Sequence, residues 1–248
     1  MKSSVSKGII CLKDDLNIEY RVCIIEYILN EDETFEYRFY PNYDVISLLS
    51  NHVFQGIPGL NLDLKKEVYI RKNILPVFIS ERVPFKNRED YFELLEKVNM
   101  TYMDPIEFLI KSKERYSGDH FYLISYEASK RIDIEEIKGK VNAFGLTKMI
   151  LQEMASNNSV YLNGTKINDQ KVFNTLHYLY NKQYLLLKDK QKEGIDLAKN
   201  RGQFKGRKEA YVNIMAFYET LEKVQRKELT NKQAAEKLGI SIDKYYRV

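Results

Sequence analysis

Cationic side chains separated by glycines occupy a short segment near the end of the chain. Guanidinium and ammonium groups pair with phosphates, and Arg inserts readily into the narrow minor groove of A·T-rich DNA. Glycines let an extended segment approach such a surface closely. The segment therefore predicts an arm that binds double-stranded DNA, although each cation taken singly is explained equally well as a solvated surface charge. The residues of this arm are Arg201, Gly202, Lys205, Gly206, Arg207 and Lys208.

The residues after the arm have the pattern of two short helices joined by a tight turn. Thr230 and Gln233 have the spacing of a capping box, and Gly239 stands where the turn requires a positive φ. Small or apolar residues occupy the positions that two packed helices must bury. This pattern predicts a helix-turn-helix over residues 231–248, with an ordinary helical hairpin as the alternative. The expected core positions are Ala234, Ala235, Leu238, Ile240, Tyr245 and Val248.

The second helix of a helix-turn-helix enters the major groove of DNA and presents its side chains to the base edges. In this chain we expect Ile242, Asp243 and Lys244 to contact base edges. Contacts to phosphates fix the orientation of such a helix without selecting sequence. We assign these phosphate contacts to a second group of residues, Ser241, Tyr246 and Arg247.

Three features follow one another toward the end of the chain. They are a long helix ending near residue 200, an Arg-Gly…Gly-Arg arm, and the ending Gly239-Ile240-Ser241…Tyr246-Arg247. The order resembles the C-terminal part of serine recombinases of the resolvase/invertase family, over about a quarter of the chain. That resemblance implies a three-helix domain that binds double-stranded DNA. The catalytic domain of the family does not match, because no Arg precedes Arg21 and the early serines lie before the first predicted strand. No catalytic residue is therefore assigned.

The first 128 residues predict an α+β domain in which strands come first, helices follow and a strand closes. Apolar and β-branched residues indicate strands at 8–12 and 20–29, and aromatic alternation indicates another at 35–40. Helices are expected at 89–98 and from Pro105, whose N-cap would be Asp104. A turn at 117–119 leads into an expected strand at 120–125.

Three motifs follow one another in this domain. They are Leu75-Pro76 with Phe78, then Asp104-Pro105 with its helix, then Gly118-Asp119 before a strand. They resemble the small N-terminal subdomain of HipA-type toxin kinases. The resemblance implies an interaction or regulatory module that contacts a protein partner. No phosphate-binding glycine loop follows, so phosphoryl transfer is not expected.

The remaining candidates for chemistry are scattered. The histidines His52, His120 and His177 have no metal-ligand spacing with Cys11 or Cys23. The Asp119-His120 pair is typical of a turn followed by a strand. Neither a metal nor a cofactor is therefore expected.

Residues 129–200 are expected to be mainly helical. One helix is predicted over 133–156, a small hairpin around Asn163-Gly164, and a long helix over 169–200. The long helix carries a near-heptad apolar seam that Gln183 interrupts. The seam predicts a homodimer, with packing inside its own domain as the alternative. The seam residues are Val172, Leu176, Leu179 and Leu186.

The charge of the chain is divided unevenly. From residue 182 to the end there are sixteen Lys and Arg against nine Asp and Glu, whereas residues 1–181 hold 23 against 26. A basic tail on a mildly acidic body favours a polyanionic partner. No run of 18 apolar residues is present, and two cysteines are too few for a disulfide framework, so we expect a soluble cytoplasmic protein without membrane contact that joins the nucleoid when bound.

These patterns together predict an α+β chain with three segments: an interaction domain at 1–128, a helical connector at 129–200, and the arm with its three-helix domain at 201–248. The expected function is sequence-specific binding of double-stranded DNA, as a transcriptional regulator or a mobile-element accessory factor. Two alternatives stay open. One is a nuclease targeted by the helix-turn-helix, and the other is a toxin-antitoxin component that binds a HipA-type partner.

Overall fold

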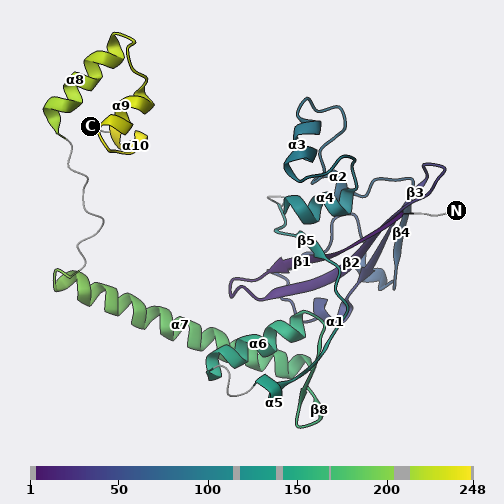
Figure 1. Cartoon of the computed structure of the whole chain (residues 1–248). Coiled ribbons are helices and arrows are strands. Elements are labelled where there is room, and N and C mark those ends of the chain that lie inside the picture. The colour runs from purple at the N-terminus through teal and green to yellow at the C-terminus, as the bar shows by residue number, and fades with distance from the viewer. Residues whose placement is uncertain (1–3, 114–117, 138–141, 168, 204–212, 247–248) are drawn as a thin grey trace. The chain divides into compact units, whose positions relative to one another are not determined.

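The computed structural model describes residues 4–113, 118–137, 142–167, 169–203 and 213–246 (Figure 1). It is a mixed α and β structure that divides into two compact units, Met1–Leu187 and Lys188–Val248. The long helix crosses the boundary between the units. Each unit is described below by itself.

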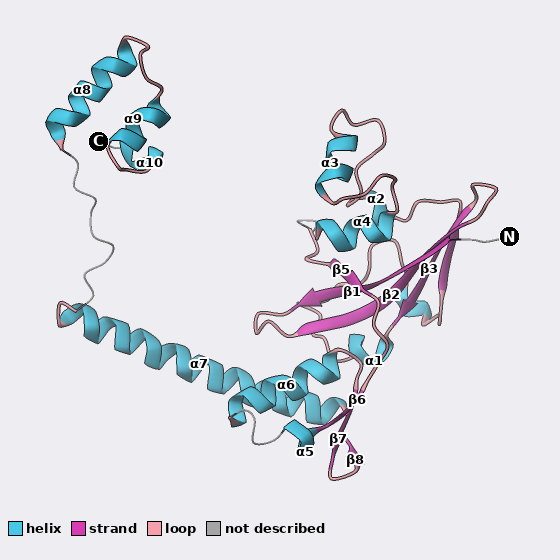
Figure 2. Ribbon diagram, viewed as in Figure 1, coloured by secondary structure: helices cyan, strands magenta, loops and turns pink. Residues whose placement is uncertain are grey.

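The first unit is built on an antiparallel sheet of five strands in the order β4-β3-β2-β1-β5 (Figure 2). The strands expected near 8–12, 20–29, 35–40 and 120–125 are present. The short strand β4 was not expected, because its four residues carry two charges and pair only with β3. The bounds are β1 Ser4–Lys13, β2 Glu19–Leu29, β3 Phe35–Pro41, β4 Tyr69–Lys72 and β5 Tyr122–Ser125.

The two faces of this sheet differ in what covers them. Ile10 pairs with Cys23 and Ile9 pairs with Ile24, and neighbouring side chains alternate between faces. Ile10 and Cys23 belong to the main apolar core of the unit. The opposite face holds a small apolar cluster of Ile9, Cys11 and Tyr122. Polar side chains therefore have room on this second face.

Short helices follow the first strands, as expected for a strands-then-helices domain. Their bounds are α1 Tyr43–Ile46, the 3-10 helix η1 Leu62–Leu64, α2 Val77–Ser80, α3 Tyr91–Lys97 and α4 Pro105–Ser112. Helix α4 begins as predicted, since the Asp104 side chain accepts a hydrogen bond from the Glu107 amide and Pro105 occupies the first turn. It packs against β1, β2 and β5 and buries Ile106 and Leu109.

Phe78 of the first motif and Asp119 of the third meet at a partly buried ion pair. The Arg82 guanidinium, whose side chain is 0 % exposed, pairs with Asp119 and donates to the Phe78 carbonyl at 2.7 Å. Asp119 also accepts from the Phe121 amide at 3.1 Å, and His120 between them has a φ of 61°. The expected strand therefore begins at Tyr122 rather than at residue 120. This arrangement gives the Gly-Asp turn a structural role.

The single helix predicted over 133–156 is wrong. Strand β6 (Arg131–Asp133) and helix α5 (Ile134–Ile137) precede the helix α6 (Ala143–Ala155), and residues 138–141 lie outside the described part. Strand β6 forms because it pairs in parallel with β7 (Ser159–Leu162), an interaction that a local helical pattern does not reveal. The expected hairpin is present: β8 (Thr165–Lys166) follows Asn163 and Gly164, which both have positive φ.

The long helix α7 (Gln170–Asn200) ends where the sequence predicts. Its first half packs on the first unit through Phe173 and Tyr180, which are buried. The Phe173 ring meets the edge of Tyr20, and Tyr180 stacks on Phe144 with 4.5 Å between ring centroids. The apolar residues of α6, β7 and the start of α7 join the core of the sheet. Residues 129–187 therefore share one core with the sheet that precedes them.

The second unit contains, beyond the end of α7, the three helices α8 (Ile214–Gln225), α9 (Asn231–Lys237) and α10 (Ile242–Tyr245). Among the residues that the structure describes, no helix combines the length and apolarity needed to cross a bilayer.

Candidate nucleic-acid interface

Helices α8, α9 and α10 pack around a small apolar core of Phe217, Ala234, Ala235 and Tyr245. The rings of Phe217 and Tyr245 lie 5.3 Å apart between centroids. The two alanines allow the helices to approach closely. Leu221, Val224, Leu238 and Ile240 pack against this core and are partly buried. The core positions expected from the sequence lie in this cluster, except Val248, which lies outside the described residues.

The start of α9 and the turn after it have the local chemistry that their sequence predicts. Thr230 and Gln233 form a reciprocal capping box: the Gln233 amide donates to Thr230 Oγ1, and the Thr230 amide donates to Gln233 Oε1 at 2.9 Å. Gly239 has a φ of 65°, which ends α9 and directs the chain into the next helix. The turn is closed by the Ile240 amide, which donates to the Ala235 carbonyl at 3.1 Å.

Helix α10 presents the predicted DNA-contacting side chains outward. Ile242 and Tyr246 are 40 % and 66 % exposed, and Asp243 is also exposed. Lys244 is half-buried, and Arg247 lies outside the described residues. Ser241 caps α10 by accepting a hydrogen bond from the Lys244 amide at 3.4 Å. Its hydroxyl oxygen is therefore used as an acceptor, and its own O–H is left as a donor.

One contact across the turn was missed in the sequence. Asn231 Nδ2 donates to the hydroxyl of Tyr246 at 3.0 Å, and this joins the first residue of α9 to the residue after α10. The two residues are 15 positions apart and neither has a motif of its own, so no local pattern indicates the pairing. The contact adds Asn231 to the residues that orient α10.

The residues of the predicted arm are only partly described. Arg201 and Gly202 form the turn that ends α7: Gly202 has a φ of 67°, and its amide donates to the Lys199 carbonyl at 2.9 Å. The amide of Gln203 donates to the Ala198 carbonyl at 2.9 Å. Arg201 is exposed. Lys205, Gly206, Arg207 and Lys208 lie outside the described residues.

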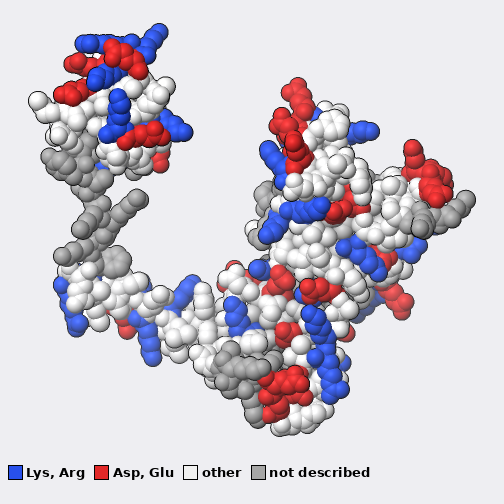
Figure 3. Space-filling view, in the orientation of Figure 1, with Lys and Arg blue, Asp and Glu red and all other residues white. Residues whose placement is uncertain are grey.

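The basic excess of the tail does not come from the three helices. Residues 213–246 hold six Lys and Arg against five Asp and Glu, whereas residues 182–212 hold nine against four. The space-filling view shows blue and red side chains interleaved over these helices (Figure 3). The net positive charge of the tail therefore lies mainly at the end of α7 and in the arm.

The apolar seam of α7 separates into two parts. Val172, Leu179 and Leu186 are exposed in the single chain, at 38 %, 49 % and 61 %. Leu176 instead packs, half-buried, against the core of the first unit. Gln183, the polar interruption, is exposed. The exposed residues follow one another at intervals of seven, so they form a stripe beside the face that packs on the chain's own core.

Groups for metal or thiol chemistry do not converge. In the described part of the chain, no group of three or more His, Cys, Asp and Glu has metal-binding geometry. Cys11 and Cys23 are buried, and burial raises the pKa of both thiols, so each stays protonated at neutral pH. His177 lies 3.0 Å from Asp14, which links α7 to the turn between β1 and β2.

Comparison of the chain with protein-family models, curated proteins and solved structures found no match.

Proposed function

We propose that residues 201–248 form a DNA-binding domain in which α9 and α10 are the two helices of a helix-turn-helix. The observation that carries the proposal is the turn at Gly239, which packs α10 on α9 through Ala235 and Tyr245 while Ile242 and Tyr246 stay exposed. Packing of this kind leaves one side of the second helix available to the major groove. The basic excess at the end of α7 and in the arm supplies attraction to phosphates.

The proposed contacts divide between base edges and backbone. Ile242, Asp243 and Lys244 contact base edges, and Tyr246 and Arg247 contact phosphates. Ser241 also contacts a phosphate, because its hydroxyl oxygen accepts the Lys244 amide and leaves its own O–H to donate. The cationic arm lies in the adjoining minor groove, where a narrow A·T-rich groove attracts Arg.

The exposed stripe of α7 supports a homodimer. A single helix-turn-helix offers a small interface, and specific sites usually consist of two half-sites related by the two-fold axis of a dimer. Val172, Leu179 and Leu186 leave apolar surface on α7 that a second copy would cover. The protein would then act on DNA in the cytoplasm as a dimeric transcriptional regulator or a mobile-element accessory factor.

Selection of bound duplexes from a random-sequence library, with the full chain as bait, tests the proposal. We expect one enriched motif with two related half-sites. Lys244→Ala should change the preferred base at one or two positions, whereas Arg207→Ala should reduce binding mainly at sites with A·T-rich flanks. A library without enrichment would contradict specific binding. Cleavage of plasmid by the pure protein with Mg²⁺ would instead favour the nuclease alternative.

A second candidate function is binding of a protein partner through the first unit, as in the toxin-antitoxin alternative. Large apolar side chains around α2 and α3 are exposed, which is typical of interaction surfaces. Co-purification from the host of the wild type and of a Phe85→Ser, Phe92→Ser double variant tests this function. If the wild type and the double variant retain the same partner, this surface is not the site that binds it. The exposed residues are Ile74, Leu75, Val77, Phe85 and Phe92.

A further inference from the structure

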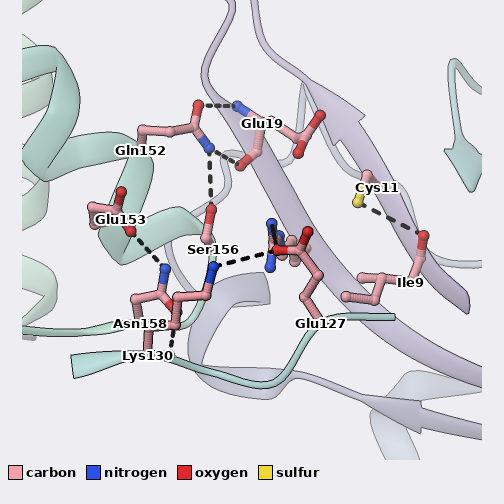
Figure 4. A network of polar contacts seen from close by, with 10 residues as sticks. Ile9, Cys11, Glu19, Glu127, Lys130, Gln152, Glu153, Ser156 and Asn158 are labelled. Atoms are coloured by element: carbon pink, nitrogen blue, oxygen red, sulfur yellow. Dashed lines mark hydrogen bonds and ion pairs between the residues drawn. The ribbon is translucent and has the colours of Figure 1, made fainter. Parts of the chain in front are cut away.

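A polar cleft lies on the second face of the sheet, where β2 meets the segment after β5 and the end of α6. It consists of two adjoining cavities of about 370 and 400 Å³ that share Arg21, Glu127 and Ser156. Each volume falls in the range of small-molecule sites, about 300–1,000 Å³. The close-up shows Glu127, Lys130 and Ser156 directed toward the same space (Figure 4).

The walls of the cleft are fixed by hydrogen bonds between distant parts of the chain. The Gln152 side chain accepts from the Glu19 amide at 3.0 Å and donates to the Glu19 carbonyl at 2.9 Å, which ties α6 to β2 (Figure 4). The same Gln152 amide group donates to Ser156 Oγ at 3.2 Å. Asn158, which is buried, accepts from the Lys130 amide at 2.7 Å. A cleft with walls held in this way needs little reorganisation to bind a ligand.

Arg21 is a cation of this cleft whose hydrogen-bonding capacity is only partly used. Its side chain is 17 % exposed, and its Nε is buried without a hydrogen-bond partner among the described residues. Its contact with Glu127 Oε2 is long, at 3.5 Å, and the same oxygen pairs with Lys130 at 3.8 Å, while the Glu127 side chain stays 54 % exposed. A guanidinium presents five N–H donors in a planar fork that matches a carboxylate. A ligand carboxylate in the cleft would accept from the terminal N–H groups of the partly exposed Arg21 side chain, because Nε itself has almost no accessible surface.

The other lining residues narrow the chemistry of the ligand. Glu127 and the exposed Asp44 offer carboxylates near Arg21, and Ile9, Ile24 and Pro41 add apolar surface. The adjoining cavity adds Glu19 and Glu153 along with Lys13 and Lys130. A phosphate dianion would meet repulsion from these carboxylates, whereas a molecule with both charges would find a partner for each.

We propose that this cleft binds a free α-amino acid with an apolar side chain. The α-carboxylate pairs with Arg21, the α-ammonium pairs with Glu127, and the side chain packs against Ile9 and Ile24. This site is independent of DNA binding, because every residue that forms it lies in the first unit. Occupancy would stabilise the first unit by an amount that rises with the logarithm of ligand concentration above the dissociation constant, as for any ligand that binds only the folded state.

Isothermal titration of the full chain tests the proposal, with five probes: L-leucine, L-phenylalanine, L-leucinamide, 4-methylpentanoate and inorganic phosphate. We expect saturable one-to-one binding of at least one of the two amino acids. The amide lacks the carboxylate and 4-methylpentanoate lacks the ammonium, so both should bind at least tenfold more weakly than leucine. Phosphate should not compete.

Variants of the two charged partners complete the test. Arg21→Gln should weaken amino-acid binding by about tenfold to a hundredfold, the loss expected for a charge-assisted hydrogen bond. Glu127 lies on an exposed segment, so Glu127→Gln should leave the sheet intact. We expect this substitution to weaken amino-acid binding several-fold. It keeps the test valid if Arg21→Gln does not fold. Arg88→Gln, outside the cleft, is the matched control and should bind as the wild type does. Absence of binding by both amino acids, equal binding of phosphate, or unchanged affinity in both cleft variants would overturn the proposal.

Discussion

Asn231 Nδ2 donates a hydrogen bond to the hydroxyl of Tyr246 at 3.0 Å, so the first residue of α9 is joined to the residue that follows α10. The neighbouring residue Tyr245 is buried, packs on Phe217 in the core and contacts the Tyr246 ring with 6.1 Å between centroids. Tyr245 and Tyr246 therefore both restrain α10. This restraint sets which face of the short helix is available to a partner.

The turn between α9 and α10 depends on a left-handed residue. An added Cβ at Gly239 would meet no atom within 4 Å, so replacement by Ala costs only the strain of a φ of 65°. We expect Gly239→Ala to destabilise the second unit by about 1 kcal/mol. Gly194→Ala is the control, because Gly194 lies inside α7 without positive φ and should gain helix propensity. Calorimetric unfolding measures both. Equal effects of the two substitutions would contradict this role of Gly239.

The buried ion pair beneath the Gly-Asp turn should contribute strongly to stability. Asp119→Ala removes the carboxylate that lies nearer to the fully buried Arg82 guanidinium, which keeps its longer contact with Glu81 at 3.5 Å. We expect a loss of about 3 kcal/mol in the free energy of unfolding. The control is Asp90→Ala, which removes an exposed pair with Arg88 and should cost at most about 1 kcal/mol. Urea denaturation of both variants decides. A similar small loss in the two would show that the turn is held by other contacts.

The link between α7 and the first unit should depend on pH in the acid range. Burial raises the pKa of the Asp14 carboxyl, but hydrogen bonds from His177, the Ile18 amide and Tyr20 outweigh it and hold the pKa below its ordinary value. A carboxyl with a lowered folded pKa adds stability above its unfolded pKa of about 3.9, and this stability is lost as pH falls through the folded value. Asp14→Asn should therefore be less stable than the wild type at pH 7.

The difference between Asp14→Asn and the wild type should shrink as pH falls below about 4. Urea midpoints at pH 7, 4 and 3 measure it. Asp196→Asn, on an exposed part of α7, serves as the control and should show little difference at any of these pH values. A stability difference for Asp14→Asn that stays constant down to pH 3 would refute the role given to this carboxylate.

Local chemistry made part of this molecule predictable from sequence. The capping pairs at Asp104 and Thr230 and the Asn163-Gly164 turn each act within a few residues, so their patterns indicate them directly. Features that need distant partners were not predictable. Strand β6 has three residues and pairs in parallel with a strand about 28 residues further along, so no local pattern indicates it.

The sites show the same division. The sequence indicates the residues of α10 because the helix-turn-helix pattern is local. The cleft at Arg21 draws its lining from β2, from the segment after β5 and from the end of α6. No spacing in the sequence brings these three segments together, since the hydrogen bonds of Gln152 and Asn158 do so only in the folded chain.

Assembly through α7 is testable with charge substitutions. Leu179→Lys with Leu186→Lys would place two charges in the proposed dimer interface, and we expect a monomer that keeps its helical content. The control is Tyr178→Lys with Leu185→Lys, which has the same spacing on another exposed face and should remain dimeric. Sedimentation of the three proteins distinguishes the outcomes. A monomeric wild type, or a double variant at Leu179 and Leu186 that is still dimeric, would contradict dimerisation through the apolar seam of α7.

We propose that the tail binds DNA and that the first unit does not. Residues 1–199 contain the whole core of the first unit and lack the arm and α8 to α10. Fluorescence anisotropy with the duplex selected by the full chain compares the two proteins directly. We predict saturable binding by the full chain, weakening steeply as salt rises, and no specific binding by residues 1–199. Specific binding of that duplex by residues 1–199 would contradict the account.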